Sequence, residues 1–114
     1  EKESALSRII DSVESYLNSH EVKWFYIGKT DNFEERAESH RQEGYNQIFE
    51  LAIASSDAIA YLEEAVIFYF KEKGDCRIKN ENNGSGGNPQ SRILYVACLA
   101  LIPQHYSLTL FISA

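Results

Sequence analysis

Helix-like and strand-like segments alternate along the whole chain, and this alternation is the strongest constraint on its fold. Apolar residues recur with helical spacing from Leu6 to Leu17, which predicts a first helix over about residues 4–19. Runs rich in β-branched and aromatic residues predict strands between further helical segments. We predict strands over 22–27, 47–54, 92–101 and 106–112. We predict helices over about 31–44, with Asp31 as the capping residue, and over about 57–73, capped by Ser55 and Ser56. The order α-β-α-β-α-β-β predicts an α+β fold, with a small mixed or antiparallel sheet flanked by helices.

Length and cysteine content limit the class of protein. The 114 residues suffice for one domain with its own core, so we expect a single domain over 1–114. No apolar run approaches the roughly 18 residues of a membrane span, and we expect no membrane partner. Cys76 and Cys98 fit neither a zinc site nor a disulfide framework, and Cys98 lies in an apolar run that predicts burial. This cysteine usage predicts an intracellular, cytoplasmic location.

Charge and loop composition exclude two further classes of site. The net charge of -6 argues against a strongly basic coat that binds nucleic acid nonspecifically, although it allows a local basic site. Residues 80–91 are rich in Asn, Gly and Ser and predict a long loop. The glycines of this loop match neither a P-loop nor a dinucleotide-binding fingerprint, so a phosphate cradle is not expected there.

Two segments carry polar side chains suited to phosphate chemistry. Arg36 and His40 are four residues apart on the predicted second helix and share a face. A guanidinium matches the geometry of a phosphate, and an imidazole can carry a proton near neutral pH. At the end of the first strand, Tyr26, Gly28 and Lys29 offer a phenol, space for a close approach and a positive charge. Spacing alone favours a solvated helix face and an aromatic strand that ends in a turn glycine.

The third predicted helix places a carboxylate beside its apolar stripe, which comprises Ile59, Leu62, Val66, Tyr69 and Phe70. On a helical wheel Glu63 borders this stripe, whereas Glu64 points away from it. A carboxylate at the edge of a core is paired, protonated or bound to a metal. Magnesium needs only one or two protein carboxylates because it keeps several waters. Glu63 is therefore a candidate metal ligand, or else a salt-bridged residue at the edge of the core.

These segments together resemble the second half of the GIY-YIG nuclease signature. In that family a Tyr-Ile-Gly strand leads into a helix with an Arg, often followed four residues later by a His. Tyr26-Ile27-Gly28, Arg36 and His40 fit this pattern, and Glu63 fits the family's metal-binding helix. Asn80 fits best the Asn that often follows this helix, although Asn82 and Asn83 compete. The first helix and a C-terminal strand pair over about 92–112 would be additions to the family fold.

The resemblance implies a metal-dependent endonuclease that hydrolyses phosphodiester bonds of nucleic acid, with DNA as the expected partner. It implies that Glu63 holds Mg²⁺ or Mn²⁺ and that Arg36 binds the scissile phosphate. Tyr26 would orient or deprotonate the attacking water with help from His40. Gly28, Lys29 and Asn80 would complete the substrate-binding surface.

The chain departs from the family at its first motif, a Gly-Ile-Tyr-like strand about ten residues before the second motif. The corresponding segment, 12–18, has no glycine and shows helical periodicity. Three alternatives remain: Tyr16 lies on a short strand, Tyr95 takes the missing tyrosine's place in a rearranged sheet, or the role is vacant. The last alternative predicts a catalytically impaired binding or regulatory module. The acidic charge supports it, unless an additional protein or DNA-binding module supplies affinity.

Overall fold

Strand β3 (Ile93–Ala100) lies at the centre of the sheet, although it is the last long strand in the chain. The computed structural model describes residues 2–82, 84, 87–101 and 112–113. β3 pairs antiparallel with β1 (Val22–Thr30) on one side and with β2 (Gln47–Ile53) on the other. The short β4 (Ile112–Ser113) pairs parallel with β2. The rest of the predicted strand 106–112 lies outside the described residues.

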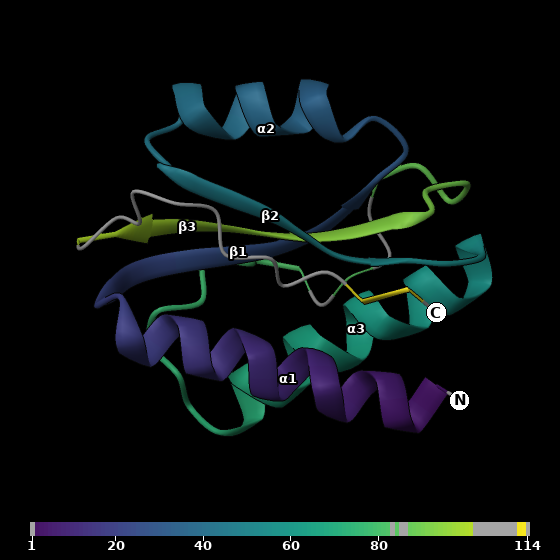
Figure 1. The fold of residues 1–114 in the computed structure, drawn as a ribbon, viewed down its shortest axis with the longest axis horizontal. Helices are drawn as coiled ribbons and strands as arrows, with labels where there is room; N and C mark the ends of the chain where they lie inside the picture. Colours follow the sequence, from purple (N-terminus) through teal and green to yellow (C-terminus); the bar gives the residue numbers. More distant parts are fainter. Residues whose placement is uncertain (1, 83, 85–86, 102–111, 114) are drawn as a thin grey trace.

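Helices cover both faces of the sheet (Figure 1). The first and third, α1 (Lys2–Ser19) and α3 (Ser56–Glu72), lie on one face, and α2 (Phe33–Gln42) lies on the other. The element order is the predicted one, and the fold is of the α+β class. No helix in the described part of the chain is long and apolar enough to cross a membrane.

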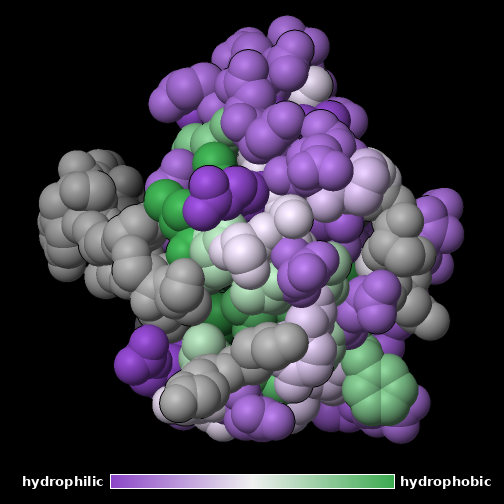
Figure 2. Space-filling view, turned by 90° about the vertical axis from the view of Figure 1, so that its right-hand side faces the viewer, coloured by the Kyte–Doolittle hydropathy of each residue, from purple (hydrophilic) through white to green (hydrophobic). Residues whose placement is uncertain are grey.

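The hydrophobic core lies between the sheet and the pair α1 and α3. Its large, fully buried side chains include Ile9, Leu17, Phe25, Ile27, Leu62, Ile67, Phe70 and Leu94. Cys98 is buried in the same cluster, as predicted. Helix α2 is far more polar and buries only Ala37 and His40. Figure 2 shows hydrophilic side chains over α2 at the top of the view. The sheet face beneath α2 is therefore where polar side chains can meet.

Two expectations about the helices are wrong. The N-cap of α2 is Asn32, whose side chain accepts a hydrogen bond from Glu35 N at 3.2 Å, and Asp31 does not cap the helix. The reason is that β1 continues to Thr30 instead of ending at Gly28, which moves the turn along the chain. Tyr69 is 36% exposed and does not belong to the buried stripe of α3. The predicted cap of α3 is confirmed, because Ser55 Oγ accepts from Ala58 N at 3.2 Å.

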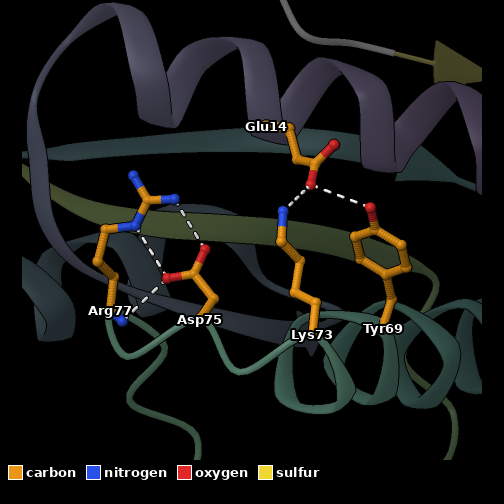
Figure 3. A network of polar contacts seen from close by, with 5 residues as sticks. All are labelled: Glu14, Tyr69, Lys73, Asp75 and Arg77. Carbon is orange, nitrogen blue, oxygen red and sulfur yellow. Dashed lines mark hydrogen bonds and ion pairs between the residues drawn. The ribbon is translucent and has the colours of Figure 1, made fainter.

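Tyr69 instead helps to tie α3 to α1 (Figure 3). Its hydroxyl donates to Glu14 Oε2 on α1 at 3.0 Å, and Lys73 forms an ion pair with the same carboxylate. Beyond the helix, Asp75 accepts hydrogen bonds from the backbone and the guanidinium of Arg77. This pair fixes the turn that brings the chain back to the sheet.

The segment that follows the turn pairs with the outer edge of β1. Phe25 N donates to Arg77 O at 2.9 Å, and Lys79 N donates to Phe25 O at 2.8 Å. Asn80 continues the pattern with its side chain, which accepts from Ile27 N at 2.8 Å and donates to Ile27 O at 2.7 Å. The segment after the turn thereby covers the open edge of β1 from Phe25 to Ile27.

Candidate functional site

A pocket of about 700 Å³ opens beside β1 and collects side chains from four elements and from the segment after α3. The predicted site residues that line it are Tyr26, Lys29, Arg36, His40, Glu63 and Asn80. Tyr95 of β3 lines it as well. The phenol, guanidinium, imidazole and carboxylate that the sequence singled out therefore share one cavity, although they come from distant parts of the chain.

Gly28 is not among the residues that line this cavity, but it makes room for Tyr95, which does line it. The two residues are partners in the β1–β3 register. A Cβ atom on Gly28 would lie 2.5 Å from Tyr95 Cζ and 2.9 Å from Tyr26 Cε1, closer than such atoms can approach. The glycine is needed because the Tyr95 ring crosses over it. The close approach expected at Gly28 is thus made by a side chain of the protein itself.

The Tyr95 hydroxyl is held between two residues of α2. It lies 2.9 Å from His40 Nε2, and it is hydrogen-bonded to the Arg36 guanidinium. Burial raises the pKa of Tyr95 to about 12, and Arg36 acts against this rise. Tyr95 is therefore a neutral phenol at physiological pH that accepts from Arg36 and can donate to His40.

His40 is 2% exposed and has a polar neighbour at each ring nitrogen. Its Nδ1 lies 3.1 Å from Glu43 Oε1, and its Nε2 faces Arg36 as well as Tyr95. Burial, followed by the charge of Arg36, lowers the pKa of His40, while Glu43 opposes the change. The ring is therefore held in its neutral form near pH 7, as a proton acceptor requires.

Tyr26 completes the aromatic wall of the pocket. Its ring centroid lies 5.1 Å from that of His40 and 6.4 Å from that of Tyr95. Burial raises the pKa of Tyr26, the negative charge of Glu63 raises it further, and Arg36 lowers it. Glu63 also raises the pKa of Tyr95. The carboxylate of α3 thus acts electrostatically on both phenols.

Glu63 is a suitable ligand for a hard divalent cation. It is 6% exposed and lines the pocket, so its carboxylate lies at the inner wall of a solvent-connected cavity. The described residues contain no cluster of three or more His, Cys, Asp or Glu side chains that could hold a metal alone. The donor set fits a cation that takes one protein carboxylate and completes its shell with water and phosphate oxygens.

Asn80 has a clear structural task in the pocket. It is 9% exposed, and both polar groups of its amide are engaged with the backbone of Ile27. These bonds fix the pocket wall and the edge of β1 together. Its expected contact with substrate stays a prediction, and the geometry gives it a supporting function at the site.

Sequence reasoning missed one site residue and left another among alternatives. Tyr16 lies in the last turn of α1 and stacks on His20 with ring centroids 4.1 Å apart, so its placement on a strand is wrong. Tyr95, the second alternative, lines the pocket together with Tyr26 and Tyr45. Glu43 was not predicted, although its position three residues after His40 is a spacing at which helical side chains meet.

Comparison of the chain with protein-family models, with curated proteins and with solved structures finds no significant match.

Proposed function

We propose that the chain is a metal-dependent endonuclease of the GIY-YIG type that hydrolyses phosphodiester bonds, with DNA as its expected substrate. The observation that carries this proposal is the shared pocket of Tyr26, Arg36, His40, Glu63 and Tyr95. Such a set supplies a phosphate-binding cation, a proton acceptor, phenols that orient water and a carboxylate for a metal. The sequence resemblance selects these residue types independently of their spatial arrangement.

Tyr95 fits the function that the family gives to the tyrosine of its first motif. Its strand neighbours the strand of Tyr26 in the sheet but follows it in the chain. This arrangement supports the alternative of a rearranged sheet over that of a vacant position. It also explains why the segment before β1 lacks the motif and forms α1.

The proposed reaction uses the contacts already described. The attacking water passes a proton to Tyr95 as the Tyr95 proton moves to His40 Nε2, 2.9 Å away. The oxygen of the water bonds to phosphorus, the bond from phosphorus to the 3′ oxygen breaks, and solvent returns a proton to that oxygen. Arg36 stabilises the charge on the phosphoryl oxygens, and Tyr26 orients the water. A divalent cation on Glu63 would supply positive charge near the departing 3′ oxygen.

Acidic side chains outnumber basic ones around the pocket. Lys29, Arg36 and Lys79 line the pocket together with acidic residues, namely Asp31, Glu35, Glu43, Glu63 and Glu81. With a net charge of -6, the domain has little long-range attraction for nucleic acid. We therefore propose that an additional protein or DNA-binding module delivers the substrate.

The free thiols of Cys76 and Cys98 fit an intracellular, cytoplasmic setting, which we include in the proposal.

A cleavage assay on supercoiled and branched DNA with Mg²⁺ or Mn²⁺ tests the proposal. We expect Arg36→Ala to lower the cleavage rate by about 10²–10³-fold, since it removes the main donor to the transition state. Arg41→Ala is the matched control, because Arg41 is exposed on the same helix and pairs with Glu38. Glu63→Gln should reduce cleavage to background, whereas Glu64→Gln, on an exposed neighbouring residue, should not.

Two results would contradict a metal-dependent endonuclease that uses Glu63. One is cleavage that persists in excess EDTA or in the Glu63→Gln variant. The other is the absence of metal-dependent cleavage at a protein concentration at which calorimetry also detects no Mg²⁺ or Mn²⁺ uptake. The second result would favour the catalytically impaired binding or regulatory module.

A further inference from the structure

The ring of His40 has donors on one side and an acceptor on the other. Its Nε2 lies 2.9 Å from the Tyr95 hydroxyl and 3.5 Å from Arg36 Nη2, and a guanidinium can only donate. Its Nδ1 lies 3.1 Å from Glu43 Oε1, and an ionised carboxylate can only accept. A neutral imidazole satisfies both sides in one way, with its proton on Nδ1 and its lone pair on Nε2.

Glu43 is well placed to select this tautomer. It is the C-cap residue of α2, and its backbone N–H bonds to carbonyls of the last turn, including His40 O at 3.0 Å. The carboxylate is therefore carried by a fixed backbone position next to the ring. The His40 side chain is only 3% exposed, whereas that of Glu43 is 60% exposed, so water is a poor competitor at the ring and solvates the carboxylate.

We propose that Glu43 is a positioning residue that keeps the His40 proton on Nδ1 and so leaves Nε2 able to receive the Tyr95 proton. The inference deepens the proposed function, on which its catalytic consequence rests. With the opposite tautomer, Nε2–H would point at a phenol proton and at a guanidinium, and no acceptor would remain for Tyr95. When the Tyr95 O–H bond breaks, its proton forms the second N–H bond of a His40 imidazolium, whose charge Glu43 then stabilises.

Several groups set the titration of His40 from the elements packed around it. The charged or titratable groups that face it are Arg36 and Glu43 of α2 and its cap, Tyr45 beyond that cap, Tyr26 of β1 and Tyr95 of β3. Arg36 lowers the pKa of His40, and the Glu43 charge and hydrogen bond raise it. Removal of the Glu43 carboxylate should therefore lower the pKa of His40 further. The neutral ring would then no longer be held with its proton on Nδ1.

The direct test is the ¹⁵N chemical-shift pattern of His40, measured by NMR on the whole chain without DNA or metal. We expect the wild type to carry its neutral-ring proton on Nδ1. Glu43→Ala should give a mixture of tautomers or a proton on Nε2, and Glu43→Gln, which keeps an acceptor oxygen, should restore the Nδ1 proton. Glu38→Ala is the control, since Glu38 is an exposed acid of α2 that pairs with Arg41. An Nε2 proton in the wild type, or an unchanged Nδ1 proton in Glu43→Ala, would overturn the inference.

Cleavage kinetics test the consequence. Glu43→Ala should lower kcat by about 10-fold or more, because less of His40 would have the lone pair on Nε2 that accepts the Tyr95 proton. KM should stay nearly unchanged. The acid limb of the pH profile should move to lower pH in Glu43→Ala and stay in place in Glu38→Ala. If the tautomer behaves as expected and the wild type cleaves no DNA, the endonuclease proposal fails and the positioning by Glu43 stands. If the wild type cleaves DNA with the Nε2 tautomer, only the inference fails.

Discussion

The contact between Gly28 and Tyr95 is the most demanding packing relation at the pocket. The Cβ of an alanine at this position would lie 2.5 Å from Tyr95 Cζ, so the ring would have to move. We expect Gly28→Ala to lower the free energy of unfolding by about 1–3 kcal/mol, the usual cost of an added methyl group in a packed site. Urea denaturation measures this change. The hydrogen bond from Tyr95 to His40 should be lost with the same substitution.

A double-mutant cycle separates this cause from a general intolerance of alanine in β1. In a Tyr95→Leu background the ring is absent, and Gly28→Ala should then cost less than in the wild type. An equal cost in both backgrounds would mean that Tyr95 is not the reason for the glycine.

At the level of elements, the turn after α3 contains an ion pair between Asp75 and Arg77, which predicts a pH effect on stability. Hydrogen bonds from Arg77 lower the pKa of Asp75 below its ordinary value of 3.8. A lowered folded-state pKa stabilises the protein above the ordinary value, and this contribution is lost as the pH falls through the folded-state value. Asp75→Asn should therefore cost about 1–2 kcal/mol at pH 7, and the difference from wild type should narrow below about pH 4.

Urea unfolding at pH 7 and at pH 3 to 4 tests this expectation. Asp11→Asn serves as the control, because Asp11 is an exposed acid on α1 and should change stability little at either pH. A difference between Asp75→Asn and wild type that stays constant with pH would show that the carboxylate charge is not what matters.

The edge of β1 depends in the same way on Asn80. In Asn80→Asp the carbonyl of Ile27 loses its donor and faces a carboxylate oxygen instead. Leaving a buried polar group unsatisfied costs about 1–3 kcal/mol, more when a charge is involved, so we expect a loss of stability in that range or above. Hydrogen exchange of the Ile27 amide should accelerate as the edge opens. Asn82→Asp, on an exposed residue of the same segment, should have neither effect.

Local patterns predicted the elements well because the relevant information is local. Helical periodicity located α1 and α3, and the cap at Ser55 was predicted correctly. Errors arose where long-range contacts decide the outcome. The pairing of β1 with the last long strand extends it to Thr30, which moves the cap to Asn32, and the bond to Glu14 keeps Tyr69 at the surface.

The site was predictable to the extent that its chemistry is carried by single helices and strand ends. Arg36 and His40 share a helical face, and a helical wheel placed Glu63 at the edge of the core. Their spacing and residue types were therefore enough to predict them as candidate site residues. Tyr95 could be named only in one of three alternatives, because its partner Gly28 is far away in the sequence. The central position of β3 is a property of the whole sheet, and no local pattern reports it.

For the whole molecule, the net charge of -6 and the three cations of the pocket predict how the affinity for DNA should respond to salt. Each phosphate neutralised on duplex DNA contributes a slope of about -0.9 to the logarithm of affinity against the logarithm of salt concentration. With Lys29, Arg36 and Lys79 as the cations in the pocket, the slope should be no steeper than about -3. Lys79→Ala should reduce its magnitude by about 1. Fluorescence anisotropy with labelled DNA across a salt series gives the slope, and Arg8→Ala, an exposed cation of α1, should leave it unchanged. A much steeper wild-type slope, or equal effects of the two variants, would mean that DNA contacts a different face and that the pocket is not where the backbone is bound.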